Sequence, residues 1–109
     1  MEKLTLSVPA LANLNANFAY ICEGDCMINA RIFDGDIVYI HHQETVDDGD
    51  IAAVLVDDKA MLKRVRIYDD HISLVPENPK YKPLVYWGSE MNNVRIIGKA
   101  VAVTHIIKN

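Results

Sequence analysis

The stretch DGDIAAVLVDDKAMLKRVRIYDDHISLV, residues 48–75, contains three short apolar segments that are separated by pairs of aspartates. The segments at 51–56, 60–67 and 71–75 are rich in valine, isoleucine and leucine, which favours strands over loops. The pairs Asp57-Asp58 and Asp69-Asp70 are typical turn formers, and such short turns join neighbouring antiparallel strands. The stretch therefore predicts a β-meander in which the acidic pairs are solvated hairpin turns.

The same pattern continues on both sides of this stretch. Further strands are predicted at residues 18–22, 36–41 and 94–107. Turn formers stand between them, for example Asp34-Gly35-Asp36 and Glu77-Asn78-Pro79. No segment keeps a helical period for long, and we expect helical turns only at residues 10–15 and directly after Cys26. The sequence therefore predicts one mostly β domain over residues 1–109, a meander or small barrel.

Composition excludes several classes of function. The net charge of −4 argues against nucleic-acid binding by this segment, because phosphate binding depends largely on lysine and arginine. No apolar run approaches the roughly 20 residues of a spanning helix, and no signal-peptide pattern is present. Two cysteines four residues apart do not form a secreted disulfide framework. We therefore expect a cytoplasmic protein that makes no membrane contact.

Lys63 occupies an unusual position in the predicted strand at 60–67. Alternation places it on one face with Met61, Val65 and Ile67, and places Arg64 on the opposite face. A lysine that loses its water favours the neutral form, and a neutral amine can accept a proton. The alternative is that the ammonium group reaches water at the edge of the sheet.

The segment Glu23-Gly24-Asp25-Cys26-Met27 directly follows the first predicted strand. A glycine at this point permits a sharp turn, which can expose the next side chain and aim neighbouring N–H groups at one point. Such a turn can present a nucleophile together with an oxyanion pocket. The alternative is a plain turn that buries a small thiol.

Other candidate residues point more weakly to function. Cys22 and Cys26 with His41 and His42 can be drawn as a zinc site, but no second ligand pair has matching spacing, and Cys22 is better explained by core packing. A redox sensor built on the two cysteines is a remoter alternative. His41-His42 is expected to face solvent, and Trp87 is expected to pack against the core or a dimer partner. The acidic pairs lack the ligand spacing of an EF-hand.

Five blocks in this order resemble the self-cleaving C-terminal domain of LexA-like and phage-type repressors, which is a serine–lysine peptidase with a signal-peptidase-like fold. The blocks are Gly24-Asp25-Cys26-Met27, Ile32-Phe33-Asp34-Gly35-Asp36, Lys63-Arg64-Val65, Pro76-Glu77-Asn78 with Tyr81-Lys82-Pro83, and Ile97-Gly98-Lys99-Ala100-Val101. Each block alone is weak, whereas the ordered set is specific. The resemblance implies several coiled antiparallel sheets with a small barrel-like core.

The resemblance also implies a mechanism and a set of partners. Matched by position, Cys26 is the nucleophile, Lys63 is the general base, and the N–H groups of Asp25 and Cys26 are the oxyanion donors. The substrate is the protein's own N-terminal linker, and no cofactor or metal takes part. Family members form homodimers through this domain and bind DNA through a separate N-terminal domain. The activated RecA filament is a candidate co-protease.

The chain departs from the family pattern in two ways. Cys26 stands where the family has serine, and no Ala-Gly or Cys-Gly pair, the bond that the family cuts, occurs in the 109 residues. We therefore expect the DNA-binding domain and the cleavage linker to lie outside this sequence. The rival interpretation is a dimerisation module without peptidase activity. The long apolar stretch at 94–107 is predicted to contribute to the dimer, because as an open edge it would promote aggregation.

Overall fold

The computed structural model describes residues 15–105 and residue 107, and strands are its main regular elements. The helical turn expected at residues 10–15 lies outside the described residues except for Asn15. The elements are, in chain order, β1 (Phe18–Ile21), the 3-10 helix η2 (Ile28–Ala30), β2 (Ile37–His42), β3 (Ile51–Val56), β4 (Lys59–Ile67), β5 (His71–Val75), β6 (Leu84–Trp87), the 3-10 helix η3 (Gly88–Asn93) and β7 (Val94–Thr104). None of the described helices is long and apolar enough to cross a membrane.

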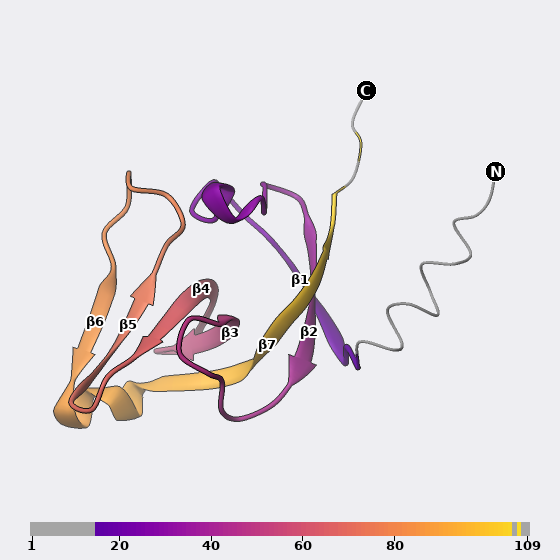
Figure 1. Cartoon of the computed structure of the whole chain (residues 1–109). Helices are drawn as coiled ribbons and strands as arrows, with labels where there is room; N and C mark the ends of the chain where they lie inside the picture. Colours follow the sequence, from indigo (N-terminus) through magenta and orange to yellow (C-terminus); the bar gives the residue numbers. More distant parts are fainter. Residues whose placement is uncertain (1–14, 106, 108–109) are drawn as a thin grey trace.

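The described strands join in a single antiparallel sheet with the order β1-β2-β7-β3-β4-β5-β6, and the sheet is strongly curled (Figure 1). The predicted mostly β, coiled antiparallel fold is confirmed. The last strand of the chain, β7, lies in the middle of the sheet between β2 and β3. Its apolar composition therefore suits a central strand. The prediction that this stretch needs a partner is met largely by β2 and β3 of the same chain.

The pairing of β7 is divided between its two neighbours. Residues 94–99 pair with β3, and residues 98–104 pair with β2. Each ladder contains one irregularity, between Tyr39 and Ile40 in β2 and between Ala53 and Val54 in β3. Irregularities of this kind increase local twist, which fits the strong curl of the sheet. β7 thus joins two half-sheets, β1–β2 and β3–β6.

Gly98 lies where the two ladders overlap. It pairs with His42 of β2 and with Ala53 of β3. A Cβ atom added at this position would lie 2.3 Å from the carbonyl oxygen of His41. The close approach of β2 to β7 therefore requires a residue without a side chain.

Two of the acidic turns show how far the turn prediction holds. Asp57 and Asp58 form the tight β3–β4 hairpin with φ angles of 50° and 64°, as two-residue hairpin turns require. Asp36 is different, because it is buried, accepts a hydrogen bond from the Phe33 N–H and pairs with His105 at 2.7 Å. The prediction of a solvated turn is therefore wrong for Asp36, whose carboxylate is a buried part of the structure.

The core has two clusters, and the first lies between the two half-sheets, because its buried residues come from β2 as well as from β3 and β4. Cys22, Met27, Val38, Ile40 and Leu62 belong to the first, whereas Val54, Val65 and Leu74 belong to the second. Leu62 and Val65 lie on opposite faces of β4, and both are buried. Alternation in the sequence predicts an apolar face with Met61 and Lys63 and a polar face with the arginines. That division is too simple, because the curled sheet buries part of each face.

The strand β6 and the helix η3 were not predicted. β6 has four residues, follows Pro83 and lies at the edge of the sheet, so it carries little of the alternation that marks a half-buried strand. Its last residue, Trp87, is about half exposed and stacks on His71 with ring centroids 4.0 Å apart. Of the two expected positions of Trp87, the core is therefore wrong, whereas packing against a dimer partner stays a prediction.

Candidate active site

A sharp turn at residues 23–27 leaves the end of β1 and carries Cys26. Gly24 has a φ of 83°, which residues with side chains rarely adopt, and its N–H donates to the Asp34 carboxylate at 2.8 Å. The Gly35 N–H donates to the Cys22 carbonyl, and the Cys22 N–H donates to the Asp36 carbonyl. The Asp34-Gly35-Asp36 segment thus braces the turn, which gives this motif a structural purpose.

The residues on either side of the turn anchor it in the core. Cys22 and Met27 are both buried in the first core cluster. Cys26 lies between them and is only partly buried against the same cluster. The turn therefore holds the Cys26 backbone firmly while leaving its thiol accessible.

Lys63 reaches Cys26 from the other half-sheet. Its Nζ atom donates to the Cys26 Sγ atom at 3.4 Å, across 37 positions of sequence. Lys63 is half buried in β4, opposite Ala52 of β3. The predicted proximity of the thiol and the amine is confirmed.

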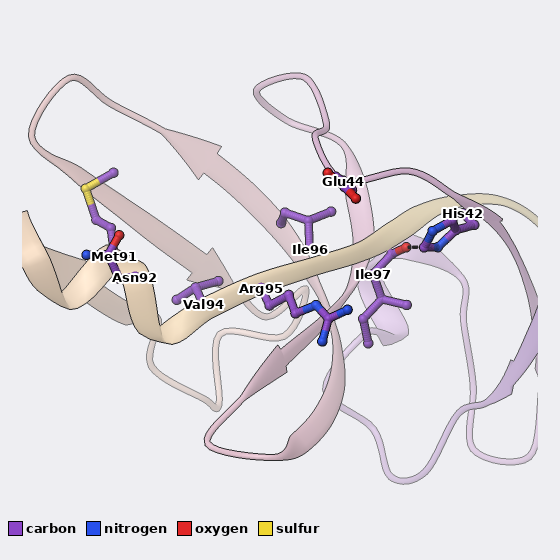
Figure 2. Close-up of a pocket in the computed structure, with 8 residues that line it drawn as sticks. All are labelled: His42, Glu44, Met91, Asn92, Val94, Arg95, Ile96 and Ile97. Atoms are coloured by element: carbon purple, nitrogen blue, oxygen red, sulfur yellow. Dashed lines mark hydrogen bonds between the residues drawn. The ribbon is translucent and has the colours of Figure 1, made fainter.

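The thiol and the amine share an open pocket of about 360 Å³. Its wall includes the apolar side chains of Pro76 and Leu84 and the ring of Tyr81. A larger pocket, about 600 Å³, lies elsewhere, between His42 at the end of β2, the first half of β7 and η3 (Figure 2). Neither Cys26 nor Lys63 lines the larger pocket, so the chemistry of this site belongs to the smaller one.

Two backbone N–H groups in the turn are candidate oxyanion donors. Within the described part of the chain, the N–H groups of Asp25 and Cys26 donate to no protein acceptor. Adjacent N–H groups beside a nucleophile can bind the oxyanion of an acyl-transfer intermediate. The positions match those that the family resemblance implies.

Residues 77–81 pass over the turn and hold it, and we call this segment the strap. The Asn78 side-chain amide donates to the Asp25 carbonyl at 2.9 Å, and the Glu77 carbonyl accepts from the Asn29 N–H at 2.8 Å. This segment belongs to the family blocks in the sequence, but the resemblance implies no role for its residues. The Asn-Pro turn was the visible signal, but no sequence pattern shows which distant carbonyl an asparagine meets.

The Asp25 side chain is held by the end of the strap. The Tyr81 hydroxyl donates to the Asp25 carboxylate at 2.5 Å, and Lys80 forms an ion pair with it at 3.6 Å. These contacts lower the pKa of Asp25 below its ordinary value, with the Tyr81 hydrogen bond as the main cause. The same bond raises the pKa of Tyr81.

The zinc alternative does not fit the geometry. Cys22 lies beside Asp36, just before the start of β2, whereas His41 and His42 lie at the other end of β2, roughly 15 Å away. His41 is half buried and pairs with Gln43, and His42 is exposed and contacts the Ile97 carbonyl. Both cysteines are free thiols, and burial raises the pKa of the Cys22 thiol. The core packing predicted for Cys22 is confirmed.

Comparison with known proteins finds one matching family model and a set of related repressors. The family model described as Peptidase S24-like matches residues 2–101. The LexA repressor of Oleidesulfovibrio alaskensis is 44% identical over 84 residues, which cover 77% of this chain and 40% of that protein. The LexA repressor of Thermosipho africanus is 37% identical over 105 residues, which cover 96% of this chain and 52% of that protein.

The chain spans about two fifths to one half of the length of these curated relatives. The match to the family model covers nearly all of the described residues, including the turn that carries Cys26, β4 and the strap. The curled, mostly β fold agrees with the resemblance drawn from the five blocks. The chain therefore belongs to the Peptidase S24-like family, as a LexA-like domain.

Proposed function

We propose that this chain is the self-cleaving and dimerising C-terminal domain of a LexA-like transcriptional repressor, with Cys26 as nucleophile and Lys63 as general base. The observation that carries the proposal is the 3.4 Å contact between Lys63 Nζ and Cys26 Sγ in an open pocket. Within the described part of the chain, the half-buried Lys63 amine forms no ion pair with a carboxylate and faces a thiol instead.

The proposed reaction cuts a peptide bond of the protein's own linker. The Lys63 amine takes the thiol proton, and the Cys26 sulfur attacks the carbonyl carbon of the bond. The N–H groups of Asp25 and Cys26 stabilise the oxyanion that forms. The Lys63 ammonium then gives its proton to the departing amine, and water hydrolyses the remaining thioester. DNA binding belongs to a separate domain, and the RecA filament is the proposed activator.

A cysteine at position 26 makes this reaction slower than one with serine. A thiolate and an ammonium attract one another before the substrate is attacked, so part of the stabilisation falls on the ground state. The larger sulfur atom also changes the geometry of attack. The second candidate function, a dimerisation module without peptidase activity, rests on this substitution.

The test is Cys26→Ser in the full-length protein with its linker and its activator present. We expect linker cleavage to appear or to become faster, because the turn and the amine are already in place. The rate should rise with pH, since only a neutral amine accepts the hydroxyl proton. Cleavage is followed by gel and by intact mass.

Lys63→Ala combined with Cys26→Ser is the matched control and should abolish the gain. If the serine protein stays uncut at every pH although its linker contains an Ala-Gly or Cys-Gly bond, the dimerisation module is the better account. A linker that contains neither bond would favour the same rival.

A further inference from the structure

We propose that Asn78 is a positioning residue, whose side-chain amide fixes the peptide group between Asp25 and Cys26 and thereby aims the Cys26 N–H at the reacting oxygen. The inference rests on the proposed function, since it assigns a purpose to Asn78 in the same reaction. It adds to the nucleophile and the base a third side chain, which acts through the backbone.

The peptide bond between Asp25 and Cys26 is planar. The Asp25 carbonyl and the Cys26 N–H belong to one rigid plane and point in opposite directions. A hydrogen bond that fixes the carbonyl oxygen therefore fixes the direction of the N–H as well. The Asn78 amide forms such a bond at 2.9 Å. The other donor to this oxygen, the Ile28 N–H, is 3.4 Å away and holds it more loosely.

Asn78 is itself held firmly. The residue is only 8% exposed, and its Oδ1 atom accepts from the Lys80 N–H at 3.0 Å. Its backbone carbonyl accepts from the Tyr81 N–H. The amide nitrogen thus has one orientation in which the oxygen keeps its own partner, and in that orientation the nitrogen faces Asp25.

The strap is anchored to the strand that carries the amine. Arg64, the neighbour of Lys63 in β4, donates to the Glu77 carboxylate at 3.0 Å and to the Gly49 carbonyl at 2.6 Å. Glu77 is the neighbour of Asn78. One strand therefore sets the position of Lys63 and, through Arg64 and Glu77, the position of the group that orients the oxyanion turn.

Asparagine suits this position because it offers an acceptor to Lys80 and a donor to Asp25 at once. Asn78→Asp keeps the acceptor for the Lys80 N–H but places an oxygen opposite the Asp25 carbonyl. Asn78→Ala removes both contacts. The aspartate variant therefore tests the hydrogen bond to the Asp25 carbonyl while the strap keeps its own contact with the Lys80 N–H.

The experiment uses the 109-residue chain and two probes of Cys26. A short peptide aldehyde ending in alanine adds to the sulfur: a carbon–sulfur bond forms, the thiol proton moves to the former carbonyl oxygen, and that oxygen lies where the N–H groups point. Iodoacetamide alkylates the same sulfur by displacing iodide, without an oxyanion. Aldehyde affinity therefore reports on the turn, and the alkylation rate reports on the thiol alone.

We expect Asn78→Asp and Asn78→Ala to weaken aldehyde binding by about tenfold or more, since losing an oxyanion donor outright costs about 10²–10³-fold. The alkylation rate between pH 6 and 10 should stay close to that of the parent, because alkylation forms no oxyanion. Asn93→Ala, an exposed asparagine in η3, is the control and should change neither probe. Thermal unfolding of each variant checks the fold.

Three different outcomes would each overturn the inference. Aldehyde affinity that is unchanged in both Asn78 variants would show that Asn78 does not aim the turn. A parallel loss of both reactivities with a lower unfolding temperature would show that Asn78 only supports the fold. A parent chain that binds the aldehyde no better than its Lys63→Ala variant would overturn the proposed function itself, and the inference with it.

Discussion

The exposed carboxylate of Asp25 shows how the strap changes the pKa of a residue beside Cys26. It is adjacent to Cys26, and its side chain receives the Tyr81 hydroxyl and the Lys80 ammonium. Both contacts favour the charged form, so the pKa of Asp25 is lowered. A lowered pKa means that these contacts stabilise the fold above the ordinary pKa and are lost as pH falls through the lowered one.

Tyr81→Phe tests the contact between the strap and Asp25. Removing the hydroxyl takes away the main cause of the shift, so the pKa of Asp25 should rise toward the ordinary value of 3.8. Carbon NMR of the side-chain carboxyl, followed through an acid titration, measures this directly. An Asp25 that titrates at its ordinary value in the parent chain would contradict the contact with Tyr81.

At the scale of elements, the meeting of β2 and β7 is the most constrained point of the sheet. Gly98 pairs on both sides, and the His41 carbonyl leaves no space for a Cβ atom. Because the obstructing atom belongs to the backbone, it cannot move aside as a flexible side chain would. The two half-sheets are held together at this point.

Gly98→Ala should therefore destabilise the chain, although alanine suits a strand no worse than glycine. We expect a loss of about 1–3 kcal/mol in the free energy of unfolding, as for other overpacked positions. Urea unfolding followed by circular dichroism measures it. Gly88→Ala is a useful comparison, because an added Cβ there meets no atom and its only cost is the positive φ of 56°. Equal stability of the Gly98 variant and the parent would contradict the close approach.

The elements also show what sequence can and cannot predict. The strands at 51–56 and 71–75 were placed correctly, because clear apolar runs end at acidic turns. The contact between Lys63 and Cys26 followed from the ordered family blocks rather than from alternation, which assigned the faces of β4 too simply. The purpose of Asn78 could not be predicted, because a hydrogen bond across 53 positions depends on how the whole sheet curls.

The second half of β7 bears on how two copies of the chain can assemble. Residues 100–104 of β7 pair with β2 on one side only, and Val103 in this segment is 43% exposed. An open strand edge beside exposed apolar residues favours pairing with a second copy around a two-fold axis. This refines the proposed dimer, which then depends on the second half of β7 rather than on the whole stretch.

We expect light scattering at micromolar concentration to give twice the chain mass of 12.3 kDa. Val103→Lys should shift the mass to that of one chain, since it places a charge at the proposed interface. Val85→Lys, in the edge strand β6 and 41% exposed, is the matched control and should leave the dimer intact. A parent mass near 12.3 kDa would contradict the proposal.

A further expectation concerns the chain as its own substrate. Its 109 residues contain no Ala-Gly or Cys-Gly pair. Incubated alone at raised pH, the chain should keep its intact mass. A specific internal cut that disappears in Lys63→Ala would show that the substrate lies inside this sequence after all.

The central place of β7 has a consequence for the order of events on the ribosome. The half-sheet with the Cys26 turn and the half-sheet with Lys63 are both synthesised before β7, yet strand pairing between them runs only through it. Until residues 94–104 emerge, the two halves lack the strand that sets their distance. A growing chain thus carries the thiol and the amine before it has the strand that joins the two half-sheets, so the 3.4 Å contact is expected to form only once β7 has paired.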